Sequence, residues 1–248
     1  HKPVLFLFIL LQMWLPCSLA GQKSDYRLFD NISLGTEASV ISCFLQDTQG
    51  LIWIGSNKGL FSYDGYSSQP HFTFGERSNT RIYCGEVVDS TYLYMGADNG
   101  LLIYNYRTDT YQEPEADFPT DIRTLALRDG VLWLGTLNGL YTYSPETRQL
   151  SAITEGLPHQ TIYSIIRASD DNLYIGTYNG CCRYIPATGR FETINLPVTG
   201  GRSNQFVNSL LEDTARGCIW IGTEGCLFKY TPADGHTRRI DAFHDNSV

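Results

Sequence analysis

The feature that most constrains the fold is a segment of eleven residues that recurs five times along the chain. Each copy opens with Trp or Tyr, has Gly two residues later and ends in Tyr. The copies are WIGSNKGLFSY (53–63), YMGADNGLLIY (94–104), WLGTLNGLYTY (133–143), YIGTYNGCCRY (174–184) and WIGTEGCLFKY (220–230). They start 41, 39, 41 and 46 residues apart. A period of about 40 residues is typical of arrays in which each unit packs against the next.

Each copy has the pattern of two strands joined by a tight turn, and further strand-like stretches flank it. Asn-Gly at 99–100, 138–139 and 179–180 favours a hairpin turn in which both central residues have positive φ. Apolar stretches precede the copies at 40–45, 82–88, 122–127, 162–166 and 206–211. Polar-aromatic stretches follow at 71–74, 111, 150–153, 191–194 and 237–240. Four strands in each unit of about 42 residues predict an all-β chain, a β-propeller of four-stranded blades.

We expect the propeller to occupy residues 21–248, with blades near 38–74, 80–113, 120–153, 160–194 and 204–241. The simplest interpretation is five blades of a truncated seven-bladed ring, with strand surface exposed at 40–45 and near 206–240. Residues 26–29 resemble an outer strand with no blade before it, yet the fifth blade already has its own outer strand. The alternative is a closed five-bladed ring in which residues 26–29 are a spare strand.

The first twenty residues predict a secretory signal peptide. Lys2 precedes an apolar run at 4–15, and Ser18-Leu19-Ala20 provides a small-residue cleavage site. The run is shorter than the roughly 20 apolar residues that span a bilayer. A buried N-terminal helix or strand is the alternative, and Pro16 before Cys17 disfavours a lipoprotein. Because the chain starts without Met, we expect a fragment of a longer protein.

Composition limits the classes of function that the chain can have. The chain is 42% hydrophobic and 18% charged, so it can bury a core. Its 18 Lys and Arg against 26 Asp and Glu give a net charge of −8. An acidic chain repels phosphate backbones, so we expect no nucleic-acid partner.

The repeats resemble two-component regulator propeller repeats, which occur in the periplasmic sensor regions of bacterial hybrid two-component histidine kinases. The first blade matches that pattern best, with Asp47, Gly50, Trp53 and Gly55 among the shared positions. Departures from the pattern are Cys226 in place of Gly, Cys181-Cys182 in place of Leu and its neighbour, and a second blade without the Asp and Gly of the first turn.

The resemblance implies a non-catalytic, exported ligand-sensing module with no cofactor. Its ligand would be a glycan-derived oligosaccharide, and its signal would pass to a histidine kinase outside this chain. The implied partners are the remaining blades and the kinase region of the same protein, and a second copy in a homodimeric parent tethered to the inner membrane.

The loops between blades and the turns between second and third strands share one face of a propeller, where a ligand could bind. The ligand-binding candidates on that face are Tyr178, Arg77, His159, Arg202 and Asn204. The recurring aromatic and Gly positions are assigned to the core instead. They are Trp53, Gly55, Tyr94, Gly96, Trp133, Gly135, Tyr174, Gly176, Trp220 and Gly222.

The sequence offers little evidence for catalysis or metal binding. His71 and the other histidines are dispersed, and we expect none of them to pair with a nucleophile. No C-x-x-C pair is present, so no metal site is expected. We expect free buried thiols, although Cys181 or Cys182 could pair with Cys218 or Cys226. A propeller glycoside hydrolase and a protein-interaction scaffold remain the alternatives, and release of a product would distinguish the hydrolase.

Overall fold

The computed structural model describes residues 34, 40–71, 80–112, 117–197 and 205–240. These residues form five four-stranded antiparallel sheets, which we number as blades 1–5 in chain order. Blade 1 contains β1 (Ile41–Gln46), β2 (Ile52–Ser56), β3 (Gly59–Tyr63) and β4 (Ser68–Pro70). Blade 2 contains β5 (Ile82–Val87), β6 (Tyr92–Ala97), β7 (Gly100–Asn105) and β8 (Thr110–Gln112). Blade 3 contains β9 (Ile122–Arg128), β10 (Val131–Thr136), β11 (Gly139–Ser144) and β12 (Gln149–Ile153).

Blade 4 contains β13 (Ile162–Arg167), β14 (Leu173–Thr177), β15 (Gly180–Ile185) and β16 (Arg190–Ile194). Blade 5 contains β17 (Val207–Asp213), β18 (Cys218–Thr223), β19 (Leu227–Thr231) and β20 (His236–Ile240). Within every sheet each strand pairs with the next one along the chain. The predicted all-β propeller architecture is thereby confirmed, and the described residues contain no helix long and apolar enough to span a membrane.

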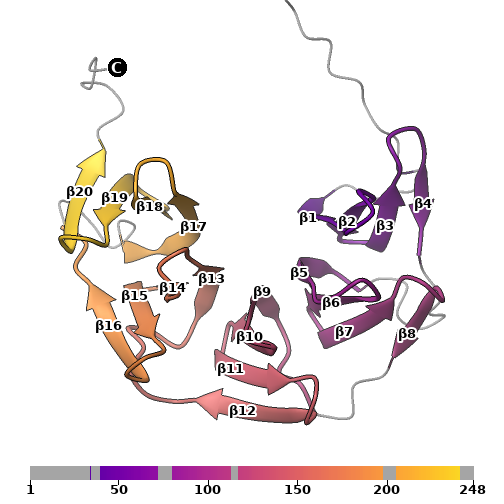
Figure 1. Ribbon diagram of the computed structural model, residues 1–248, viewed down its shortest axis with the longest axis horizontal. Coiled ribbons are helices and arrows are strands. Elements are labelled where there is room, and N and C mark those ends of the chain that lie inside the picture. Colours follow the sequence, from indigo (N-terminus) through magenta and orange to yellow (C-terminus); the bar gives the residue numbers. More distant parts are fainter. Residues whose placement is uncertain (1–33, 35–39, 72–79, 113–116, 198–204, 241–248) are drawn as a thin grey trace, which may run out of the picture. The chain divides into compact units, whose positions relative to one another are not determined.

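The blades lie side by side in chain order, and their first strands β1, β5, β9, β13 and β17 contact one another in succession (Figure 1). Four apolar clusters fill the spaces between neighbouring blades. Trp53 packs between blades 1 and 2, Tyr94 between blades 2 and 3, and Trp133 between blades 3 and 4. The core therefore lies between sheets, as expected for units that cannot bury an apolar face alone.

The recurring glycines let neighbouring blades approach closely. A Cβ added at Gly135 would lie 2.5 Å from Thr124 Cγ2 and 2.6 Å from Ile162 Cγ2 of the next blade. Gly55 and Gly96 meet Ile82 and Ile122 in the same way. A side chain at these positions would push the next blade away, so the second strand of the blade requires Gly there.

The predicted hairpin turns are wrong in one respect. Gly139 has positive φ, but Asn138 does not, and the two-residue turn is Leu137-Asn138. The hydroxyl of Thr136 accepts a hydrogen bond from Asn138 N (3.0 Å) and donates one to Gly139 O (2.9 Å). The hydroxyl holds Asn138 outside the left-handed region and leaves Gly139 as the residue with positive φ, so the Asn-Gly pair lies one position later in the turn than expected.

The outer strand of blade 1 also differs from expectation. It was expected at 71–74, but β4 is Ser68–Pro70 and pairs with β3 from Phe61 to Tyr63. The side chain of Asp64 accepts hydrogen bonds from Tyr66 N and Ser67 N, which turns the chain early and starts the strand sooner. The predicted signal peptide and residues 26–29 lie outside the described residues.

Both ends of the row of blades expose apolar side chains. On β1 and just before it, Val40, Ile41 and Phe44 are 46%, 39% and 67% exposed. On blade 5, Leu211 and Leu227 are 64% and 39% exposed. These exposed strands confirm the surfaces expected of an open ring.

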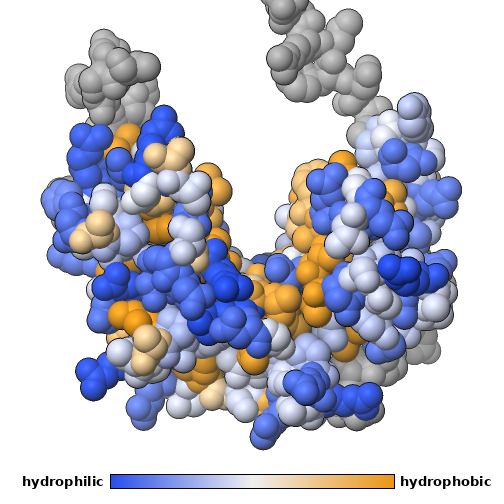
Figure 2. All heavy atoms as spheres, in the orientation of Figure 1, coloured by the Kyte–Doolittle hydropathy of each residue, from blue (hydrophilic) through white to orange (hydrophobic). Residues whose placement is uncertain are grey.

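The recurring aromatic residues differ in how deeply they are buried. Trp53 and Trp133 are 2% and 6% exposed, as expected for core residues, whereas Trp220 is only partly buried. Trp220 was expected to be buried, but among the described residues no further sheet packs against blade 5 beyond blade 4. Figure 2 shows apolar residues gathered along the inner rim near the first strands.

Trp133→Ala tests the assignment of this aromatic set to the core. Loss of a large buried side chain costs about 3–5 kcal/mol, a large part of the 5–15 kcal/mol that stabilises a typical domain. We expect Trp133→Ala to lower the melting temperature strongly, as measured by circular dichroism. Tyr178→Ala is the control, because Tyr178 is 52% exposed and its loss should leave melting nearly unchanged. Normal melting of Trp133→Ala would show that the residue is not part of the core.

Candidate ligand-binding site

A β-bulge near the start of each first strand shapes one end of the blades. We call this the crossover end, because the chain passes there from one blade to the next. In every first strand one residue has no partner on the second strand. These five residues are Ser42, Tyr83, Arg123, Tyr163 and Asn208. Bulges re-aim side chains and are frequent beside functional sites.

Four rings form a continuous row at the crossover end of blades 4 and 5. The ring centroids of Tyr163 and Phe206 are 4.5 Å apart, those of Phe206 and Tyr178 are 5.4 Å apart, and those of Tyr178 and His159 are 5.3 Å apart. We call these four residues the aromatic row. His159 Nδ1 accepts a hydrogen bond from Thr161 N (3.0 Å), so in the neutral ring the proton lies on Nε2. The row thus offers aromatic ring faces together with a hydrogen-bond donor.

A second pair of side chains lies at the same end of blades 2 and 3. The Arg123 guanidinium stacks on the ring of Tyr83, with its Cζ 3.8 Å from the ring centroid. Asp121, which precedes β9, accepts a hydrogen bond from Arg123 Nη2 (3.0 Å). Arg123 Nε is buried and has no partner among the described residues. Stacking and ion pairing hold the guanidinium in place.

Two of the five ligand-binding candidates, Tyr178 and His159, lie together in the aromatic row. Arg77, Arg202 and Asn204 lie outside the described residues. Phe206 and the bulge residues Tyr83, Arg123 and Tyr163 were not among the predicted ligand-binding residues. One signal could have found the bulge residues, because each directly follows the first Ile of its strand.

His71 makes contacts that differ from the sequence-based expectation. Its Nε2 lies 2.8 Å from Ser62 Oγ, and its Nδ1 lies 3.1 Å from Asp109 Oδ1 and 2.8 Å from the Tyr104 hydroxyl. The expectation that no histidine would pair with a nucleophile is therefore wrong in geometry. A Ser-His-Asp arrangement of this kind can serve acyl transfer when substrate reaches the serine.

The burial of Ser62 favours a structural role for this network. Ser62 is only 7% exposed, and the His71 ring packs 5.0 Å from that of buried Trp53. The Tyr104 hydroxyl also donates a hydrogen bond to Asp109 Oδ1 (2.6 Å). Asp109 Oδ1 is therefore shared between Tyr104 and His71. His71 follows β4 of blade 1, while Tyr104 and Asp109 belong to blade 2. The network therefore joins two neighbouring blades.

The network makes stability depend on pH in the acid range. Hydrogen bonds from Tyr104 and then His71 lower the pKa of Asp109 below its ordinary value. A lowered carboxyl pKa adds stability above the unfolded value of about 3.9, and this stability is lost as pH falls through the folded pKa. We expect Asp109→Asn to lose stability at pH 6 and to show a shallower decline between pH 5 and pH 3, as measured by urea unfolding. Identical pH profiles would contradict the contact. Asn tolerates the φ of 53° at this position, so the turn should survive.

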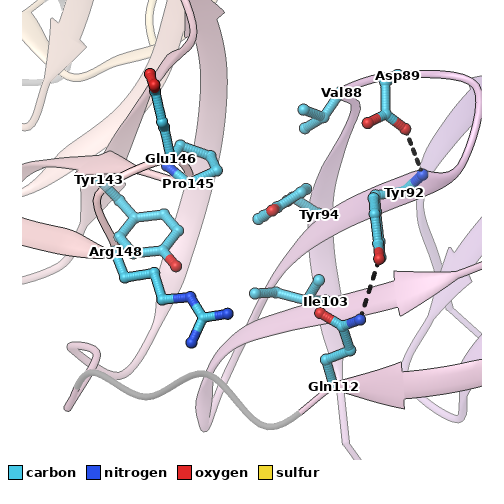
Figure 3. Close-up of a pocket in the computed structure, with 10 residues that line it drawn as sticks. All are labelled: Val88, Asp89, Tyr92, Tyr94, Ile103, Gln112, Tyr143, Pro145, Glu146 and Arg148. Atoms are coloured by element: carbon cyan, nitrogen blue, oxygen red, sulfur yellow. Dashed lines mark hydrogen bonds between the residues drawn. The ribbon is translucent and has the colours of Figure 1, made fainter.

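Hollows lie between neighbouring blades at the end opposite the crossover end. The larger, of about 590 Å³, lies between blades 2 and 3 and has Tyr92, Tyr94 and Tyr143 in its walls (Figure 3). A second, of about 350 Å³, lies between blades 4 and 5. There Glu212 accepts hydrogen bonds from Ser169 N and Oγ, which links the two blades. Among the described residues, no three His, Cys, Asp or Glu side chains are grouped so that they could hold a metal ion.

All six described cysteines are free thiols, including Cys181, Cys182, Cys218 and Cys226. The alternative disulfide pairing is therefore absent. Burial raises the pKa of Cys43 to about 11 and that of Cys182 to about 12. A thiol that stays protonated at neutral pH is a poor nucleophile.

Thiol titration tests this assignment. We expect Cys43 and Cys182 in the folded chain to react with a disulfide reagent at pH 8 far more slowly than they do in urea. Tandem mass spectrometry after alkylation would identify which cysteines reacted. Cys182 is buried and Cys43 is partly buried, so rapid labelling of either one without denaturant would contradict the raised pKa of its thiol.

Comparison with known proteins agrees with this architecture. Residues 35–58 and 156–179 match the family described as two component regulator propeller. The structure resembles the extracellular domain of BT4673 from B. thetaiotaomicron, with a TM-score of 0.83 and 65% sequence identity. That domain is assigned to a one-component system in one crystal structure and to a hybrid two-component system in another. The matches cover 89% and 88% of this chain and 30% of the BT4673 chain.

A more distant similarity concerns the fold alone. The extracellular domain of BT3049 from B. thetaiotaomicron, assigned to a hybrid two-component system, has a TM-score of 0.70 and 19% identity over 84% of this chain and 31% of that one. None of the curated proteins matches the chain. From the family match and the similarity to BT4673, the chain is a segment built of two-component regulator propeller repeats.

Proposed function

We propose that the chain is part of an exported sensor and recognises a glycan-derived oligosaccharide at the crossover end of its blades. The aromatic row is the observation that carries the proposal. Sugars offer apolar ring faces that stack on aromatic side chains and hydroxyl groups that need hydrogen-bond partners. Tyr178, 52% exposed, and its neighbours provide the stacking surface.

Each side chain would have a separate role in binding the oligosaccharide. Tyr178 and Phe206 would stack against a sugar ring, and His159 Nε2–H would donate to one of its hydroxyls. Tyr163 and the Tyr83–Arg123 pair would contact further units of the same oligosaccharide. Arg77, Arg202 and Asn204 stay proposals for the same face.

The proposed event is binding without turnover. Hydrolysis of a glycosidic bond generally needs two carboxyl groups on either side of it, about 5–10 Å apart. The four residues of the aromatic row contain no carboxyl group, and Asp121 is already bonded to Arg123. The bound oligosaccharide would therefore leave the site unchanged, which suits a sensor.

Signalling would depend on regions beyond this chain. The chain spans 30% of the length of the BT4673 domain, whose crystal structures assign it to one-component and hybrid two-component systems. We propose that further blades complete the ring, that the parent is tethered to the inner membrane as a homodimer, and that binding biases a histidine kinase region.

Tyr178→Ala tests the proposed function. We expect oligosaccharides from a glycan panel to bind the chain in calorimetry, with affinity reduced at least tenfold in Tyr178→Ala and an unchanged melting temperature. A lost stacking contact of about 1.4 kcal/mol corresponds to that tenfold change. Tyr66→Ala is the matched control, because Tyr66 is 96% exposed and lies at the opposite end of blade 1.

Two outcomes would contradict the proposal. One is equal affinity of the wild-type chain and Tyr178→Ala for every oligosaccharide that binds. The other is shortening of the oligosaccharide during incubation, measured by mass spectrometry, which would support the glycoside hydrolase instead. Binding of a purified protein but of no sugar would support an interaction scaffold.

A further inference from the structure

We propose that Asp121 and Arg123 form a polar subsite that binds two adjacent hydroxyl groups of a neutral sugar ring. The inference rests on the function proposed above and deepens it, because it names the feature of the sugar that is recognised at the crossover end of blades 2 and 3. The aromatic row supplies ring faces, whereas this subsite supplies hydrogen bonds that depend on the configuration of the sugar. Three departures from the repeat coincide in it.

The first departure is the backbone conformation of Asp121. This residue precedes the first strand of blade 3, as Val40, Arg81, Thr161 and Phe206 precede the first strands of the other blades. Its φ is 55°, in the left-handed region, whereas none of those four residues has a positive φ. A residue with a Cβ adopts this conformation at a cost in stability, and such residues are frequent at ligand-binding sites.

The second departure is a missing hydrogen bond in the sheet of blade 3. In the other blades the carbonyl of the residue before the first strand accepts a hydrogen bond from the turn after the second strand. The bonds are Asn57 N to Val40 O (3.1 Å), Asp98 N to Arg81 O (3.1 Å), Tyr178 N to Thr161 O (3.0 Å) and Glu224 N to Phe206 O (3.1 Å). Asp121 O accepts no such bond from the described residues, and Asp121 N instead donates to Asp98 O of blade 2 (3.1 Å). The sheet gains nothing from this arrangement, so the placement of the Asp121 carboxylate needs another explanation.

The third departure is a charged residue at the β-bulge. Arg123 occupies the position that Ser42, Tyr83, Tyr163 and Asn208 occupy in the other blades. Its guanidinium stacks on Tyr83 and donates one hydrogen bond, from Nη2 to Asp121. Its Nε is buried and has no partner among the described residues, which is costly for a charged donor. The guanidinium is therefore held in place while most of its five N–H groups are unused.

The free groups of the pair are complementary to two adjacent hydroxyls. The side chains of Arg123 and Asp121 are 27% and 33% exposed, so a ligand can reach both. Asp121 Oδ1 accepts from Arg123, which leaves Oδ2 to accept from one sugar hydroxyl while Arg123 Nη1 donates to the oxygen of the next. Asp121 would repel an anionic ligand and Arg123 a cationic one. Neutral hydroxyls, which both donate and accept, fit the pair best.

The test measures binding of methyl glycosides to the chain by saturation-transfer NMR and calorimetry. The probes are the neutral methyl glycosides of mannose, galactose and glucose, each with adjacent free hydroxyls, and the anionic methyl glycoside of glucuronic acid. We expect at least one neutral glycoside to bind at millimolar concentration, and more tightly than the anionic one. Arg123→Lys keeps the charge but loses the flat, stacked guanidinium, and it should weaken that binding about three- to tenfold.

Asp121→Gly separates binding from stability. It removes the carboxylate from a position whose φ suits glycine, so we expect binding to weaken at least about tenfold while the melting temperature stays nearly unchanged. Asp129→Gly is the matched control. Asp129 also has a positive φ, of 50°, and its carboxylate lies 2.7 Å from Arg128, but it belongs to the turn at the other end of β9. Its replacement should leave glycoside binding unchanged.

Three outcomes would overturn the subsite. They are failure of every neutral glycoside to bind, tighter binding of the glucuronic acid glycoside, and binding that survives both Asp121→Gly and Arg123→Lys. Tyr178→Ala distinguishes this proposal from the proposed function. Oligosaccharide binding that Tyr178→Ala weakens and Asp121→Gly does not would overturn the subsite alone. Glycoside binding that depends on Asp121, with oligosaccharide affinity unchanged in Tyr178→Ala, would support the subsite and contradict the role of the aromatic row.

Discussion

The architecture depends on one close contact, that between the glycine of each second strand and the first β-branched residue of the next blade. An added Cβ at Gly55, Gly96, Gly135 or Gly176 would lie within 2.8 Å of a side-chain carbon of the following blade. Because each glycine permits this approach, the aromatic residue two positions earlier can pack between the sheets. Spacing between blades is thereby fixed by a residue that carries no side chain.

The same contact explains why the ends of the row differ from its middle. Gly222 meets only Ser209 of its own blade, and the neighbouring Trp220 is partly exposed. At the other end, Phe44 of β1 is 67% exposed. Strands with such surfaces are prone to associate unless something covers them, and further blades would cover them in the ring that we propose.

The features that repeat along the chain could be predicted from the sequence. Period, strand order and the aromatic-Gly positions recur five times, so each blade supports the interpretation of the others. The turn at Leu137-Asn138 was misplaced because a hydroxyl, that of Thr136, controls it. The His71 network and the aromatic row depend on contacts between blades, and residues far apart in sequence reveal those contacts only after folding. Phe206 was missed for this reason, whereas the bulge residues had a signal in their position after the first Ile.

Hydrogen exchange would show whether an oligosaccharide binds at the crossover end. The exchange of backbone amides would be compared for the chain alone and for the chain saturated with an oligosaccharide that binds it. We expect slower exchange around residues 161–165, 177–180 and 205–207, where the aromatic row lies, and an oligosaccharide recovered intact. Unchanged exchange in all three segments, or a shortened oligosaccharide, would contradict a sensor that recognises sugar at the crossover end.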